Sequence, residues 1–186
     1  MRMTTRWAPA KKDTLRELAT EILHNYGRGR VVVAVDGDGS SGRAAFADDL
    51  AEAVRETGHA AFRASTASFS KRADGSGPES DPELDESLFR RVLIEPFRLG
   101  GSTGWVERAY DAAADRPVES AWVTGPADAL LLVDGAQLSR PGLSGLWHYR
   151  VWVTDDDARV DARAKASAVV DNSDPEHPRR RFDDAC

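Results

Sequence analysis

The sequence predicts an α/β fold, a three-layer sandwich in which a mainly parallel, five-stranded sheet lies between two layers of helices. Two apolar runs predict the centre of the sheet. Residues 31–35 and 129–133 consist of Val, Ala and Leu, which is typical of strands buried on both faces. Segments with helical periodicity separate the predicted strands, and this alternation implies right-handed crossovers and parallel pairing.

The other elements are predicted in chain order. Thr14 and Glu17 form a capping box that opens an amphipathic helix, and Gly27 ends it. A helix that starts near Leu84 is expected to close at Pro96, because proline lacks the N–H of a helix interior. The remaining expectations are strands at 60–64, 149–153 and 168–170, helices at 44–57 and 155–165, a mobile surface loop at 72–85, and an irregular excursion or short hairpins at 103–124.

The chain of 186 residues fits a single domain. We expect this domain at 13–178, between a flexible arm at 1–12 and a polar tail at 179–186, whose basic run is expected to be solvated. A formal net charge of −6 argues against nucleic-acid binding. The chain has no apolar run near the roughly 20 residues that a membrane span needs, and no signal peptide, so we expect a soluble, cytoplasmic protein.

The strand at 31–35 runs into a glycine-rich loop and then a helix, which is the context of a phosphate-binding P-loop. Gly37 and Gly42 have the spacing of the motif G-x-x-x-x-G-K-[ST]. Glycines let the backbone turn its N–H groups inward at the head of a helix, whose dipole favours an anion. The predicted nucleotide- or phosphate-binding residues are Gly37, Asp38, Gly39, Ser40, Ser41, Gly42, Arg43 and Ala44.

Two positions of this motif depart from the pattern. Arg43 stands where a lysine reaches the phosphates, and Ala44 stands where a Ser or Thr hydroxyl holds Mg²⁺. A second motif element is Asp134, which follows the apolar run 129–133 as the acid of a Walker B strand does. We therefore expect Asp134 beside the loop as an uncertain catalytic residue and metal ligand, with a structural role as the alternative.

The chain resembles the uridine kinase family of P-loop nucleoside kinases over most of residues 13–178. The resemblance implies a phosphate-loop fold that binds ATP or another nucleoside triphosphate, Mg²⁺ and a nucleoside, and that transfers phosphate to a 5′-hydroxyl. The segments that carry it are 33–37, 41–42 and 46–48 around the loop, 65–71, which is similar to the family's S-x-D-x-F-x-[KR], 127–135 with 138–147, and 169–175.

Several working parts of the family are absent from this sequence. Ala67 occupies the position of the aspartate in S-x-D-x-F, so the carboxylate that would orient or deprotonate the attacking hydroxyl is missing. The segment between the strands at 149–153 and 168–170 is too short for the family's arginine-bearing lid. Arg159 and Arg163 in that segment could contact phosphate, or could lie on a solvated helix face.

Three functions remain open. The preferred one is a nucleotide- or phosphate-binding pseudokinase with impaired phosphoryl transfer. The second is an active ATP-dependent uridine or nucleoside kinase, in which Asp36, Asp38 or Asp134 holds the metal through water. Its replacement base would come from Asp74, Glu79 or Asp81. The third is a non-catalytic scaffold, a homodimer or a partner subunit, that presents Trp105, Trp122 and the acidic loop.

Overall fold

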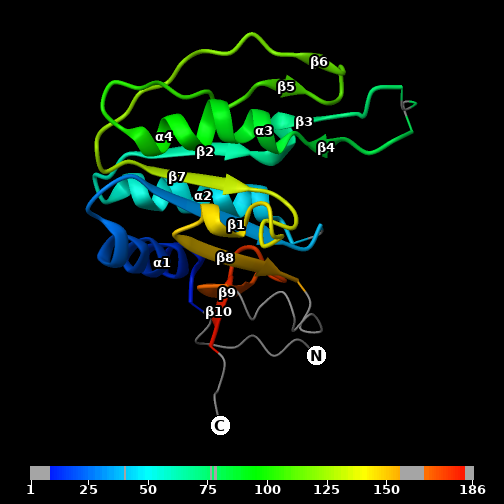
Figure 1. The fold of residues 1–186 in the computed structure, drawn as a ribbon. Helices are drawn as coiled ribbons and strands as arrows, with labels where there is room; N and C mark the ends of the chain where they lie inside the picture. Colours follow the sequence, from blue (N-terminus) through cyan, green and yellow to red (C-terminus); the bar gives the residue numbers. More distant parts are fainter. Residues whose placement is uncertain (1–8, 40, 76, 78, 156–165, 183–186) are drawn as a thin grey trace.

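A computed structural model describes residues 9–39, 41–75, 77, 79–155 and 166–182. It confirms the α/β fold with a mainly parallel sheet between two layers of helices (Figure 1). The sheet has the strand order β10-β9-β8-β1-β7-β2, in which only β10 is antiparallel to its neighbour. The strand bounds are β1 Val31–Gly37, β2 Ala61–Ser65, β7 Leu130–Asp134, β8 Tyr149–Thr154, β9 Ala168–Asp171 and β10 Arg179–Arg181.

Two apolar cores lie on opposite faces of the sheet. Helices α1 (Lys11–Tyr26) and α2 (Arg43–Glu56) cover one face, and the helical segment from α3 (Glu86–Phe89) to α4 (Glu95–Leu99) covers the other (Figure 1). Alternate residues of β1 enter the two cores, with Val31, Val33 and Val35 on the α1/α2 side. Because both faces are covered, every residue of β1 is buried, as its continuous apolar run predicts.

The sixth strand, β10, corrects the expectation of a five-stranded sheet, and it lies in the basic run expected to be solvated, of which Arg179 and Arg181 are exposed. Arg179–Arg181 pairs antiparallel with β9, with Arg179 opposite Asp171. Arg180 forms an ion pair with Glu21 of α1, and the Tyr149 hydroxyl donates to the same carboxylate at 2.6 Å. Three consecutive arginines carry no apolar strand signal. The charge partner of Arg180 lies 159 positions away in the sequence, which local pattern does not reveal.

Helix α1 begins earlier than the sequence predicts. Its first residue is Lys11 and its N-cap is Ala10, so the predicted capping box at Thr14 and Glu17 is wrong. The Thr14 hydroxyl instead donates to the carbonyl oxygen of Pro178 at 2.8 Å and ties α1 to the segment before β10. The Thr14 hydroxyl, which the local pattern assigned to a helix cap, therefore serves a contact with a distant part of the chain.

Pro96 does not close its helix, which corrects another expectation. A π-helical turn at Arg90–Ile94 precedes α4, and Pro96 lies in the first turn of α4. Proline cannot donate to the carbonyl of Val92 four residues earlier. That carbonyl accepts from the N–H of Val106 at 2.8 Å instead, so the chain continues as a helix without an unpaired acceptor.

Two short hairpins complete the described fold. Strands β5 (Tyr110–Asp111) and β6 (Arg116–Pro117) pair within the segment expected to be irregular or hairpin-like. Strand β3 (Ser70–Lys71) pairs with β4 (Glu83–Leu84), which lies within the segment 72–85 expected to be a surface loop, so the end of that segment is a strand. Trp105, offered by the scaffold hypothesis as a surface residue, is completely buried against Phe62 and Phe97. Within the described ranges, no helix combines the length and apolar character that crossing a bilayer requires.

Candidate functional site

The glycine-rich loop joins β1 to the start of α2 at Gly42. Gly42 has a left-handed backbone with φ of +68° and is the N-cap of α2. Its carbonyl accepts the first helical bond, from Phe46 N–H at 2.9 Å. A glycine N-cap has no side chain to accept from the first amides of the helix, so the N–H groups at the start of α2 have no side-chain cap. The positive end of the helix dipole lies at the same point.

Residues at the carboxyl ends of β8 and β9 contact the loop and hold it in place. A Cβ at Gly37 would lie 2.1 Å from the carbonyl oxygen of Val153, so only glycine fits beside β8. The Thr154 hydroxyl donates to the Asp38 carboxylate at 2.9 Å. The Asn172 side chain donates to the carbonyl of Ser41 at 2.8 Å. The loop shape therefore depends on the ends of β8 and β9, as well as on its own glycines.

Arg43 lies against its own loop. Its Nη1 donates to the carbonyl oxygens of Gly37 at 2.9 Å and Asp38 at 3.3 Å. These contacts use carbonyl acceptors, so they do not compete with an anion for the amide N–H groups. The Arg43 Nε is buried and has no hydrogen-bond partner among the residues that the structure describes. An unpaired buried donor of a cation is well suited to an anionic ligand.

Two cavities adjoin at Arg43. The smaller, of about 470 Å³, is lined by Gly37, Asp38 and Gly39 of the loop and by Trp152 of β8. The larger, of about 900 Å³, extends between the 3₁₀ turn Thr66–Phe69 and the start of α3. The residues that line both are Arg43, Ala136, Gln137 and Arg140. The arrangement can therefore hold a phosphate chain and a second group side by side.

The eight predicted loop residues take different places in the structure. Gly37, Asp38, Gly39 and Arg43 line the smaller cavity, whereas Ser41 and Gly42 shape the loop behind it. Ala44 is the second residue of α2, and its methyl group offers no metal ligand. Ser40 lies outside the described residues, as do residues 156–165 of the helix predicted at 155–165, with Arg159 and Arg163.

The larger cavity contains carboxylates that sequence reasoning missed. Ala67 lines it, at the position where the resembled family has an aspartate. The acidic residues Glu83, Asp85 and Glu86 also line it, whereas the proposed substitutes Asp74, Glu79 and Asp81 are not among its lining residues. The β3–β4 hairpin brings these acids to the cavity, and no local signal predicted that hairpin.

Partners are already present for two of these acids. Asp85 forms an ion pair with Lys71 at 2.8 Å and accepts from Leu88 N–H, and these contacts lower its pKa, the Lys71 hydrogen bond first. Glu86 pairs with Arg140 at 2.7 Å. Both carboxylates are therefore held in place at the cavity wall. A lowered pKa makes Asp85 a weak proton acceptor.

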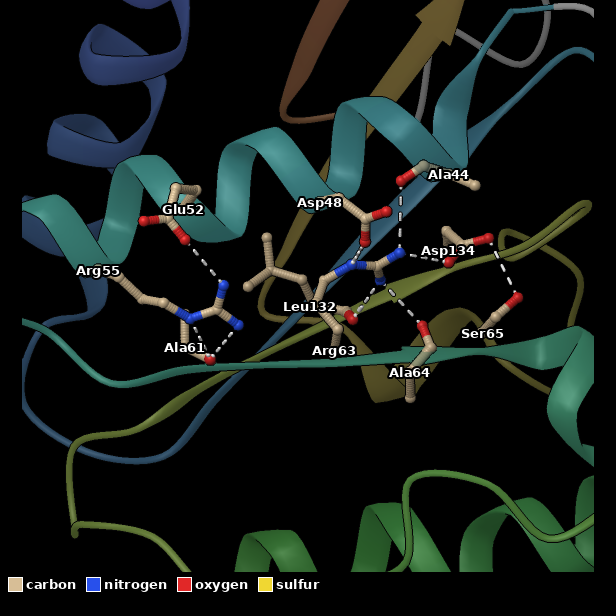
Figure 2. A network of polar contacts seen from close by, with 10 residues as sticks. All are labelled: Ala44, Asp48, Glu52, Arg55, Ala61, Arg63, Ala64, Ser65, Leu132 and Asp134. Atoms are coloured by element: carbon tan, nitrogen blue, oxygen red, sulfur yellow. Dashed lines mark hydrogen bonds and ion pairs between the residues drawn. The ribbon is translucent and has the colours of Figure 1, made fainter. Parts of the chain in front are cut away.

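Asp134 ends β7, directly opposite Val35 of β1, as the sequence predicts. Its carboxylate is already paired (Figure 2). Oδ1 accepts from Arg63 Nη2 at 2.7 Å and Oδ2 accepts from the Ser65 hydroxyl at 3.1 Å. The side chain is 7% exposed, so these bonds are shielded from solvent. Nothing in the weak strand pattern around Arg63 predicted its partner.

The residues present do not fit the magnesium ion expected from the sequence. Asp36 Oδ1 accepts from Gly37 N–H and its Oδ2 from Leu138 N–H, each at 2.8 Å, and burial raises the pKa of this carboxyl. Asp134 is paired as described, and Ala44 has no hydroxyl. Among the described residues, no group of three or more Asp, Glu, His or Cys side chains is arranged to hold a metal ion.

Comparison with known proteins bears on the fold. No protein-family model and no curated protein matches the chain. The solved structure of a possible uridine kinase from Bacillus stearothermophilus matches 76% of this chain and 79% of its own, at 20% identity and a TM-score of 0.62. A putative fructose transport system kinase from Silicibacter sp. matches 74% of this chain and 73% of its own, at 20% identity and a TM-score of 0.57. The chain therefore has the P-loop kinase fold.

Proposed function

We propose that the chain binds a nucleotide or another phosphate ester at loop residues 37–44 and that its phosphoryl transfer is strongly impaired. The observation that carries the proposal is the start of α2. There, N–H groups without a side-chain cap and the buried, unpaired Nε of Arg43 lie at the edge of the smaller cavity, within the described part of the chain. Both features are favourable for an anion.

The impairment rests on three positions, of which Ala67 lines the larger cavity. Asp134 is paired with Arg63, Ala44 has no hydroxyl, and Ala67 has no carboxylate. Loss of one acid–base group alone commonly costs about 10²–10⁴ in rate. The losses are not additive, yet three together remove most of the positioning and charge neutralisation on which phosphoryl transfer depends.

The two cavities indicate what the ligand contains. Phosphate fits beside the loop, and the larger cavity is the place for a nucleoside or sugar portion. The two solved structures are described as a possible uridine kinase and a putative fructose transport system kinase, and uridine and fructose both carry hydroxyl groups. Glu86 and Arg140, paired at the wall of the larger cavity, offer hydrogen bonds to such hydroxyls.

A pair of glycine variants tests the binding site. A Cβ at Gly39 meets nothing within 4 Å, so Gly39→Leu is compatible with the fold and places a side chain in the smaller cavity. Gly145 is equally open but lies in the turn Ser144–Leu146, away from both cavities, so Gly145→Leu is the matched control. Calorimetric titration with ATP, GTP, uridine monophosphate and inorganic phosphate should show binding to the wild type and Gly145→Leu but not to Gly39→Leu. Absence of binding to the wild type, or equal binding to all three, would contradict the proposal.

A second candidate function is an active nucleoside or sugar kinase. The observation that favours it is the junction of the two cavities at Arg43, with Asp85 on the wall of the larger one. Production of a monophosphate from a panel of nucleosides and sugars, with ATP and several divalent metals, would support it if Asp85→Asn abolished the activity. No product from any combination would leave binding as the function.

A further inference from the structure

We infer that Arg63 occupies the place of a divalent cation beside Asp134, so that phosphate binding at the loop is independent of magnesium. This inference rests on the proposed function, because it concerns how the same site compensates the charge of its ligand. It goes beyond the absence of a hydroxyl at Ala44, because it names the group that replaces the metal.

The guanidinium pairs with the carboxylate that a metal would use, and it also reaches the residue at the hydroxyl position of the loop motif, where it meets the backbone carbonyl and not the side chain. Arg63 Nη2 donates to Asp134 Oδ1 at 2.7 Å and contacts the carbonyl oxygen of Ala44 at 3.4 Å (Figure 2). Asp134 has the Walker B position at the end of β7. Ala44 has the Ser or Thr position of the loop motif, at the start of α2. A divalent ion between them would lie against a fixed positive charge.

Further bonds fix Arg63 in this place. Its Nε donates to Asp48 of α2 at 2.8 Å, and its Nη1 donates to the carbonyl oxygens of Leu132 at 2.9 Å and Ala64 at 3.0 Å. The guanidinium thus uses all of its nitrogens to join α2, β7 and β2 (Figure 2). It cannot leave Asp134 without breaking these bonds, and its side chain is only 18% exposed.

The two acids that precede Gly39 in the loop already accept hydrogen bonds within the fold. Both oxygens of Asp36 accept backbone N–H groups, and Asp38 accepts from the Thr154 hydroxyl. A ligand phosphate at the loop would be compensated by Arg43 and by the start of α2 instead. The site therefore takes a phosphate ester in its metal-free form.

The first test uses the wild-type protein and ATP. Calorimetric titrations with excess Mg²⁺ and with EDTA should give dissociation constants that differ by less than about tenfold. A loss of more than about tenfold in EDTA would overturn the inference and leave the proposed function standing. Absence of binding in both buffers would overturn the proposed function, and the inference with it.

The second test frees Asp134. Arg63→Gln removes the cation from the carboxylate, so this variant should bind Mn²⁺, detected by electron paramagnetic resonance, whereas the wild type should not. Adding Asp134→Asn to Arg63→Gln should abolish the gained site. The matched control is Arg55→Gln. This variant loses bonds to Glu52 of α2 and Ala61 of β2 but leaves Asp134 paired (Figure 2).

Equal Mn²⁺ binding by the wild type and Arg63→Gln would overturn the inference. Circular dichroism confirms that each variant is folded before the comparison is made. If Arg63→Gln does not fold, the titrations of the wild type decide the question by themselves.

Discussion

The side-chain amide of Asn172, which follows β9, donates a 2.8 Å hydrogen bond to the backbone carbonyl of Ser41 in the glycine-rich loop. Both residues are buried, and they are separated by 131 positions in the sequence. The Asn172 N–H is itself fixed by the carbonyl of Thr154 at 2.7 Å. The residue after β9 therefore anchors the loop through Ser41.

Asn172→Ala should loosen the loop. Removing the donor leaves the buried carbonyl of Ser41 without this partner, at a cost of about 1–3 kcal/mol in the free energy of unfolding. Affinity for phosphate should fall as well, since the loop loses an anchor. Urea denaturation and phosphate titration measure the two effects. Glu176→Ala, at an exposed position of the same segment, is the control and should change the stability by less than about 0.5 kcal/mol.

Gly42→Ala should destabilise the protein more than Gly101→Ala does. Both glycines have a left-handed backbone, with φ of +68° and +61°, so alanine costs about 1–2 kcal/mol at either position. Only at Gly42 would the new Cβ meet a neighbour, Asn172 Nδ2 at 3.2 Å. Urea denaturation of the two variants separates the conformational cost from the contact. Equal stability of the two would show that Asn172 gives way freely.

Restoring the loop motif should not restore phosphoryl transfer. The double variant Arg43→Lys and Ala44→Ser recovers the pattern G-x-x-x-x-G-K-S, but Asp134 stays paired with Arg63, and Ala67 still lacks a carboxylate. Each such loss is worth about 10²–10⁴ in rate. We expect no formation of nucleoside monophosphate above background with ATP and Mg²⁺. Turnover by this variant would contradict the role given to Arg63.

Stability should fall in acid through Glu21. The Arg180 hydrogen bond lowers the pKa of this carboxyl below its ordinary value of 4.5, although burial acts in the opposite direction. The folded protein therefore binds fewer protons there than the unfolded chain. The stabilisation is complete above about pH 4.5 and is lost as the pH falls through the lower, folded value.

Glu21→Gln should remove this part of the pH dependence, while Glu17→Gln on the exposed face of α1 should keep it. Urea midpoints between about pH 6 and pH 3 make the comparison. An unchanged acid slope in Glu21→Gln would show that the contact between α1 and β10 contributes nothing to it.

The sequence predicted the features that are local or periodic. The valine run of β1 predicted a strand buried on both faces, and the spacing of Gly37 and Gly42 predicted the loop. The apolar run before Asp134 placed that residue at the strand edge beside the loop. The sequence did not predict β10, because its three arginines have no apolar pattern, nor did it predict that the helix continues through Pro96.

The sequence by itself determined the central part of the architecture, because strands buried on both faces and amphipathic helices have periodicities that can be counted along the chain. Only the tertiary structure decided what the site can hold. Arg63 reaches Asp134 across 71 positions, and Asn172 reaches Ser41 across 131. Hydrogen bonds and ion pairs act over a few ångströms in space. A carboxylate that local pattern assigns to a metal can therefore belong to a guanidinium that only folding brings beside it.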